Sequence, residues 1–146
     1  MPKHQAVPWY RVQNAKIVDH FYSTEPDEIG IAEKKLGYEY EGIACFVFPS
    51  VQSGAVPFYR LYSAGNANHF YTTNVEERDN AVKRLGYKTE GITGYIYADA
   101  LCGTFPLYRL YNVKGRDHFY TVSEKERDSA VKQGWRKNGI AGYVFK

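Results

Sequence analysis

The chain has 146 residues, of which 24% are charged, and its formal net charge at pH 7 is +3. This length is that of one domain, with enough chain to bury a core. Because the charges nearly balance and no run of Lys or Arg occurs, we expect no nucleic-acid partner. No stretch approaches the roughly 18 apolar residues of a membrane span, so we expect no membrane insertion.

The N-terminal residues Met1 to Gln5 lack the apolar run of a secretory signal peptide. We therefore expect a cytoplasmic protein or one secreted without a classical signal peptide. The two cysteines, Cys45 and Cys102, fall at non-equivalent places in the repeats described below. Free thiols are the simpler interpretation, and a disulfide is the alternative.

One five-residue pattern, with His-Phe-Tyr at its centre, occurs three times, and its successive histidines are 49 residues apart. Repetition at a fixed period indicates a tandem-repeat architecture. The three copies are Asp19–Ser23, Asn68–Thr72 and Asp117–Thr121. We therefore divide the single domain, residues 1–146, into repeats at 7–48, 56–97 and 105–145.

Each repeat begins with a proline and an alternation of apolar and polar residues, which is typical of the start of a strand. These segments are Pro8–Val12, Pro57–Leu61 and Pro106–Leu110. A short polar connection follows, with Gly65 in the second repeat and Gly115 in the third. Such a connection predicts a β-hairpin whose second strand carries His-Phe-Tyr.

A helix start follows each hairpin. Asn74 stands three residues before Glu77, and Ser123 stands three before Glu126, which is the capping-box pattern. The first repeat has a proline, Pro26, at the first helical position. Apolar residues then recur at helical spacing, and a glycine ends each helix. These glycines are Gly37, Gly86 and Gly134, the last of which follows Gly86 by 48 residues, so the third helix is one residue shorter.

Each repeat ends in a run that is apolar on both faces, at 41–48, 90–97 and 138–145. Such runs are typical of strands buried on both faces, so we expect this strand to be the innermost one. A small residue within each run predicts a bulge or a close approach of the backbone. These residues are Cys45, Gly94 and Gly142.

A single unit of strand, strand, helix and strand cannot bury its apolar face, but three units can do so against one another. We predict a mostly β (α+β) fold with short helices. In it the three repeats close around a pseudo-threefold axis into a three-bladed, propeller-like body. An open solenoid, which would leave two uncapped ends, is the alternative.

The motifs also resemble a known family. Tyr-Arg-Leu-Tyr, His-Phe-Tyr-Thr and Gly-Ile-x-Gly-Tyr occur in this order in the second and third repeats. This order resembles a three-copy repeat domain of unknown function in fungal and bacterial extracellular proteins, where it is often appended to hydrolases. The resemblance implies a lectin-like accessory module. The first repeat departs from the pattern, because Gln13 stands where Tyr62 and Tyr111 do, which predicts an altered or lost site there.

The histidines admit three interpretations: a hydrogen bond within each repeat, contact with a ligand, or three nitrogen ligands for zinc near the axis. The acidic or amide residue before each histidine points to the opposite side of the strand, which argues against metal ligation. We therefore expect no metal and no cofactor. The arginine of each first strand is expected to pair with a carboxylate, Glu41 or Glu90, although Asn138 breaks this pattern in the third repeat.

The tyrosine two residues after each histidine lies on the same strand face. At the surface it would offer a ring to stack on a sugar, with a histidine and an arginine to bind hydroxyls; inside, it would be a core aromatic. The candidate ligand-binding residues are Arg11, Asp19, His20, Tyr22, Arg60, Asn68, His69, Tyr71, Arg109, Asp117, His118 and Tyr120.

The sequence contains no Gly-x-Ser-x-Gly, His-Glu-x-x-His, phosphate loop or paired-cysteine motif. Three weak sites on one rigid body would raise the avidity for a dense glycan surface. We therefore predict a non-catalytic, lectin-like module with up to three equivalent sites for glycans or cell-surface polysaccharide, acting as a monomer or small homo-oligomer. The alternative is a protein-binding or protease-inhibitor scaffold that uses the hairpin loops at 14–18, 63–67 and 112–116.

Overall fold

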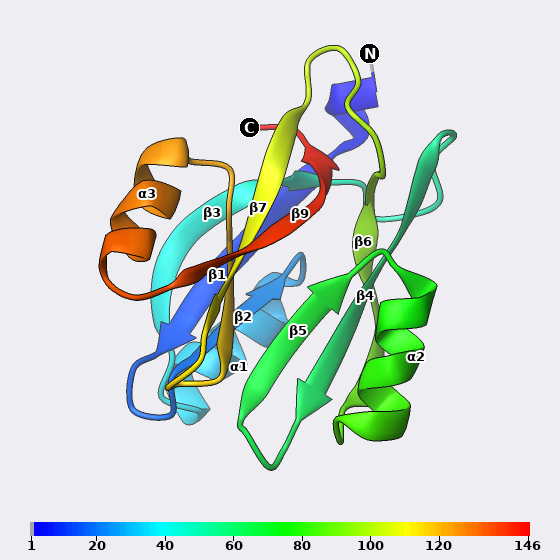
Figure 1. Ribbon diagram of the computed structural model, residues 1–146. Coiled ribbons are helices and arrows are strands. Elements are labelled where there is room, and N and C mark those ends of the chain that lie inside the picture. Colours follow the sequence, from blue (N-terminus) through cyan, green and yellow to red (C-terminus); the bar gives the residue numbers. More distant parts are fainter. Residues whose placement is uncertain (1) are drawn as a thin grey trace.

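The computed structural model describes residues 2–146. These residues form a mostly β fold with three short α-helices (Figure 1). A 3-10 helix, η1 (Pro2–Gln5), precedes three units with the same element order. Unit 1 consists of β1 (Val7–Asn14), β2 (Asp19–Ser23), α1 (Pro26–Lys35) and β3 (Glu39–Val47). Unit 2 consists of β4 (Ala55–Ser63), β5 (Asn68–Thr72), α2 (Val75–Arg84) and β6 (Lys88–Tyr97). Unit 3 consists of β7 (Phe105–Asn112), β8 (Asp117–Thr121), α3 (Glu124–Lys132) and β9 (Arg136–Val144).

Within each unit the first strand is the middle one and pairs antiparallel with both others, as in the order β2-β1-β3. Units 2 and 3 together form one six-stranded sheet in the order β5-β4-β6-β9-β7-β8. The pairing of Tyr97 in β6 with Tyr143 in β9 joins the two units. The sheets are strongly curled, like parts of a barrel (Figure 1). The predicted hairpins are confirmed.

The second strand of each hairpin is the innermost strand of the fold. The strands β2, β5 and β8 contact one another across the centre of the molecule. The last strands, β3, β6 and β9, are instead exposed along their first halves and buried toward their C-terminal ends. The prediction that the last strand is innermost is therefore wrong, because only its C-terminal residues pack in the core.

Three tyrosines, one from each innermost strand, occupy the centre of the core. The ring centroids of Tyr22, Tyr71 and Tyr120 are 5.4 Å apart in every pair, with nearly perpendicular planes. The Tyr71 hydroxyl accepts the backbone N–H of Tyr22 at 2.8 Å and donates to the Tyr22 carbonyl at 3.1 Å. The other two hydroxyls make the same pair of bonds at 2.7–3.1 Å. The packing of the three units therefore satisfies polar groups that would otherwise be buried without partners.

The last strands also link the units at their C-terminal ends. The paired residues are Phe48 with Tyr95, Tyr97 with Tyr143, and Phe46 with Phe145. The rings of Phe48, Tyr97 and Phe145 meet there, with centroids 5.6–6.2 Å apart. Because unit 1 contacts unit 3 as well as unit 2, the open-solenoid alternative is wrong.

The predicted helix caps are confirmed in units 2 and 3. The Asn74 side chain accepts the Glu77 N–H at 3.0 Å, and the Ser123 hydroxyl accepts the Glu126 N–H at 3.1 Å. Glu25 makes no such bond at the start of α1, where Pro26 occupies the first turn. The glycines expected to end the helices all have positive φ, of 78°, 78° and 103°.

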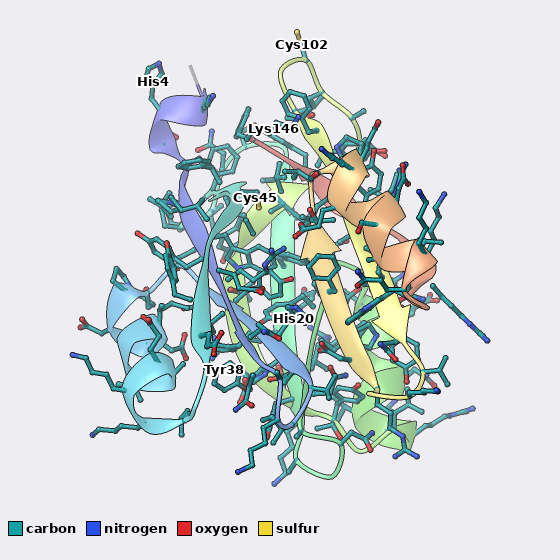
Figure 2. The ribbon with its side chains drawn as sticks, turned by 90° about the vertical axis from the view of Figure 1, so that its left-hand side faces the viewer. His4, His20, Tyr38, Cys45, Cys102 and Lys146 are labelled. Carbon is teal, nitrogen blue, oxygen red and sulfur yellow. The ribbon has the colours of Figure 1, made fainter. Side chains whose placement is uncertain are left out.

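Small residues in the last strands allow the units to approach closely, as predicted. A Cβ atom on Gly142 would lie 2.9 Å from the carbonyl oxygen of Tyr97, and one on Gly94 would lie 3.1 Å from that of Phe48. Both cysteines are free, with Cys45 buried and Cys102 exposed at a loop tip (Figure 2). Within residues 2–146, no helix is both long and apolar enough to cross a membrane.

Candidate binding clefts between the units

Three clefts lie where one unit meets another. One wall carries the histidine of one unit, and the other wall carries a helix and a phenylalanine of a second unit. We name each cleft by its histidine. The His20 cleft, between units 1 and 3, has a volume of about 580 Å³, the His69 cleft, between units 2 and 1, about 330 Å³, and the His118 cleft, between units 3 and 2, about 300 Å³.

The histidine of each cleft is held by the residue that precedes a histidine in another unit. That side chain also accepts the backbone N–H of the histidine, at 2.8–3.3 Å. The pairs are His20 Nδ1 with Asp117 Oδ2 at 2.5 Å, His69 Nδ1 with Asp19 Oδ2 at 2.6 Å, and His118 Nδ1 with Asn68 Nδ2 at 3.0 Å. The Nδ1 bond of each histidine thus joins two units, not one repeat as predicted, because the residue that points away from its own histidine reaches another unit.

A second carboxylate faces the histidine in two of the clefts. Glu41 Oε1 lies 3.7 Å from His20 Nε2, and Glu90 Oε1 lies 3.5 Å from His69 Nε2. Burial alone would lower the pKa of His69, but hydrogen bonds with Asp19 and Glu90 outweigh it and raise that pKa above its usual value. The two carboxylates therefore favour the protonated form of His69.

The His118 cleft has amides in place of both carboxylates. Asn68 stands at the position of Asp19, and Asn138 stands at the position of Glu90. Burial, assisted by the nearby Arg109, lowers the pKa of His118 to about 3. His118 is therefore a neutral ring at pH 7, and the clefts differ in charge as well as in volume.

Each arginine joins two units through a bidentate ion pair. Its two terminal nitrogens lie 2.9–3.1 Å from the carboxylate of a glutamate in the first helical turn of another unit. The pairs are Arg11 with Glu126, Arg60 with Glu28, and Arg109 with Glu77. Each guanidinium also lies 4.9–5.0 Å from the centroid of a phenylalanine ring in that unit. These pairs fix the cleft walls relative to each other.

The pairing expected within each repeat is confirmed as well. Arg11 Nε lies 2.9 Å from Glu41, and Arg60 Nε lies 3.1 Å from Glu90. In unit 3 the Nε of Arg109 donates to the backbone carbonyl of Asn138 at 3.2 Å. The pairing with glutamates of other units was not predicted, although these glutamates recur at the same spacing as the arginines, which was a usable signal.

The three central tyrosines are not part of the clefts. Tyr22, Tyr71 and Tyr120 are 0% exposed, so the core-aromatic alternative holds and their rings have no free face for a sugar. Other aromatic residues line the clefts, such as Trp135 in the His20 cleft and Tyr111 in the His118 cleft. Burial of the tyrosines depends on the packing of three units, which no single repeat reveals.

Tyr38 and Tyr87 extend two of the histidine networks. Tyr38 donates its hydroxyl hydrogen to Asp19 at 2.5 Å, and Asn68 donates to the Tyr87 hydroxyl at 2.6 Å. Trp135 occupies the corresponding position in unit 3 and has no hydroxyl to offer Asp117. Burial raises the pKa of Asp117, against the opposing effect of His20.

The histidines are too dispersed for a shared metal. Among residues 2–146, no three His, Cys, Asp or Glu side chains are grouped as ligands for a metal ion. The centre of the molecule, where the zinc alternative placed the histidines, is occupied by tyrosines. That alternative is therefore wrong.

Residues 8–145 match the family model of a domain of unknown function, DUF5648. The chain belongs to this family. No curated protein and no solved structure matches the sequence. Membership in DUF5648 agrees with the expected resemblance to an uncharacterised domain and assigns no ligand, so the chemistry of the clefts must carry any functional proposal.

Proposed function

We propose that this DUF5648 domain is a non-catalytic, lectin-like carbohydrate-binding module, with one glycan site in each cleft of a three-bladed, propeller-like body. The observation that carries the proposal is the threefold occurrence of one kind of cleft. In each, a histidine and a carboxylate or amide of one unit face a helix and an aromatic ring of another.

The chemistry of the cleft walls suits a sugar. Sites for small polar ligands combine apolar surface with a few fixed hydrogen-bonding groups. In the His69 cleft, Arg60 and Glu90 supply polar groups, and Phe21 supplies an aromatic ring. Because ion pairs with Glu28 and with each other already hold these polar side chains, little side-chain entropy would be lost when a ligand binds.

Three clefts on one body also favour a multivalent partner. A single chain carries all three clefts, so one molecule offers a glycan-coated surface more than one site at a time. Such engagement raises avidity without any new contact. We therefore propose glycans or cell-surface polysaccharide as the partner, with the domain acting as a monomer or small homo-oligomer.

A glycan array that includes fungal and bacterial cell-wall fragments tests the proposal. Selective binding is expected, and it should weaken when Tyr111, which lines the His118 cleft, and Gln13, which lines the His20 cleft, are both changed to Ala. The matched control is Lys114→Ala in an exposed hairpin loop, which should bind as the unchanged protein does. A blank array with protein that is folded by circular dichroism would overturn the proposal.

One observation favours the alternative function, a protein-binding or inhibitor scaffold. The hairpin loops gather at one end of the molecule (Figure 1). Arg116 Nη1 donates to Asn66 Oδ1 at 2.8 Å across two of them, and Val18 of the first loop packs against Gly115 of the third. Binding of a partner that engages this end should be lost when residues of the loops are substituted, and it should be retained when residues of the clefts are substituted.

A further inference from the structure

The three clefts differ in the residue that lies opposite the histidine in the hairpin. In the hairpins of units 2 and 3, Tyr62 lies opposite His69 and Tyr111 lies opposite His118. Their ring centroids are 4.6 Å and 4.8 Å from those of the histidines. Gln13 occupies this position opposite His20. A tyrosine ring therefore lies beside two of the histidines, whereas an amide side chain stands beside the third.

A second departure from the repeat lies in the opposite wall of the same cleft. Trp135 stands where units 1 and 2 have Tyr38 and Tyr87, which are buried and bound through their hydroxyls. Trp135 is half-buried, and its ring lies 5.8 Å from that of His20. The helix before it, α3, has 9 residues, whereas α1 and α2 have 10. Segments far apart in the sequence have thus changed on both walls of one cleft.

These departures make the His20 cleft larger and give it a different lining. Its volume is about 580 Å³, against about 330 Å³ and 300 Å³ for the others. Amide and hydroxyl groups line it beside the rings of Phe119 and Trp135, namely those of Gln13, Ser123, Ser129 and Gln133.

Apart from His20, the charged side chains that line this cleft balance, with Arg11 and Lys125 against Glu41 and Glu126. Arg11 binds Glu126 through two nitrogens, and its third nitrogen lies 2.9 Å from Glu41. A half-buried indole with neutral amides and hydroxyls around it is suited to a sugar ring, whose C–H face packs on the aromatic ring while its hydroxyls are hydrogen-bonded. The lining therefore favours a neutral sugar over an ionic ligand.

We infer that the His20 cleft is the principal saccharide site, in which a neutral pyranose unit packs on Trp135 and Gln13 binds its hydroxyls. This inference rests on the proposed carbohydrate-binding function and makes the three sites unequal. The His69 and His118 clefts bind more weakly, because they are smaller and no tryptophan is among the described residues that line them. Of the two outcomes predicted from Gln13, an altered site or a lost one, the inference takes the altered site.

Tryptophan emission can report on this cleft alone. The chain has two tryptophans, and Trp9 is 0% exposed in the core. The probes are chitotetraose, laminaritetraose, mannotetraose and N-acetyllactosamine. Titration of the folded protein with each, followed by fluorescence and calorimetry, should show for at least one probe a tight phase near one ligand per chain with a change in Trp135 emission.

Two variants test the assignment. Trp135→Ala should lower the affinity of the tight phase on the order of tenfold or more. Gln13→Tyr should also weaken it, and it introduces the residue that the other units carry at this position. The matched controls are Leu36→Ala and Leu85→Ala, exposed residues in the walls of the His69 and His118 clefts. They should change the tight phase less than twofold.

The outcomes separate this inference from the proposed function. Three equal sites per chain, with the tight phase unaffected by Gln13→Tyr, would overturn the inference and leave carbohydrate binding intact. If none of the four oligosaccharides and no glycan on the array binds, carbohydrate binding itself fails and the inference fails with it. Circular dichroism of each variant excludes loss of the fold as the cause of lost binding.

Discussion

The three central tyrosines and the clefts belong to the same repeats but have diverged to different extents. At the centre, the same tyrosine occurs in all three units and makes the same bonds at 2.7–3.1 Å. In the clefts, Gln13 replaces a tyrosine, Trp135 replaces another, and Asn138 replaces a glutamate. A central tyrosine is hydrogen-bonded to the backbone of another copy, so one change leaves buried groups unpaired in a second unit. A cleft residue has solvent on one side and tolerates change.

The largest effect is expected for a change at the centre. Tyr71→Ala should lower the free energy of unfolding by about 3–5 kcal/mol, because it leaves a large cavity in a close-packed core. Tyr71→Phe should cost about 1–3 kcal/mol, because the buried N–H and carbonyl of Tyr22 lose their partner. Urea unfolding followed by circular dichroism measures both changes.

The control for this prediction is Tyr40→Phe. Tyr40 is 48% exposed, so its change should alter stability by less than about 0.5 kcal/mol. Equal losses for Tyr71→Phe and Tyr40→Phe would contradict the view that the central tyrosines cannot tolerate change.

The ion pairs that join the cleft walls should have the next largest effect. Arg60→Ala removes the bidentate pair with Glu28 and should cost about 1–3 kcal/mol, reduced by the solvent that reaches Glu28. Arg78→Ala is the control, because the contacts of Arg78 with Asp79 and with the Tyr59 ring stay within one unit, and the change should cost less than about 1 kcal/mol. A double-mutant cycle of Arg60 and Glu28 that shows no coupling would contradict the prediction.

Acid should weaken the same contacts. Burial would raise the pKa of Glu28, but its hydrogen bonds with Arg60 and Ser23 outweigh burial and lower that pKa below its usual value. The pKa values of Glu77 and Glu126 are lowered in the same way, by hydrogen bonds with Arg109 and Arg11. As the pH falls, the unfolded chain therefore takes up these protons first. The stabilisation is complete above the unfolded-state pKa of about 4.3 and is lost as the pH falls through the folded-state values.

Melting temperatures measured between pH 3 and pH 7 test this expectation. They should fall steeply below about pH 4, where these three glutamates become protonated. Replacing Glu77 with Gln should flatten the fall, because one of the titrating groups is then absent. A melting temperature that stays constant down to pH 3 would show that these pairs do not contribute to stability.

The smallest expected effect on stability, with a clear spectroscopic result, is that of Asn68→Asp. The change gives His118 the carboxylate that the other two histidines have, and Tyr87 is placed to donate to it as Tyr38 donates to Asp19. The pKa of His118 should rise from about 3 toward that of a paired histidine. Titration of the imidazole signals by NMR measures it.

The control for this change is Asn80→Asp, which adds the same charge on α2 in the wall of the His118 cleft. It should move the pKa of His118 much less than Asn68→Asp does. Equal shifts would mean that general charge, and not the contact with residue 68, determines the protonation of His118.

Local interactions were predictable from the sequence by itself. The 49-residue period defined the three units, and the cap of α2 by Asn74 and the pairing of Arg60 with Glu90 were anticipated correctly. These contacts join residues of one unit, whose geometry follows from the helix start or from adjacent strands. Membership of an uncharacterised domain family was also foreseen from the motifs.

Contacts between units were decided only by the tertiary structure. The burial of Tyr71, the hold of Asp19 on His69, and the bond of Arg60 to Glu28 each join two units. A repeat pattern shows that a residue recurs and does not show which neighbour its copies meet. That choice depends on which strand faces the centre, and the packing of all three units determines it.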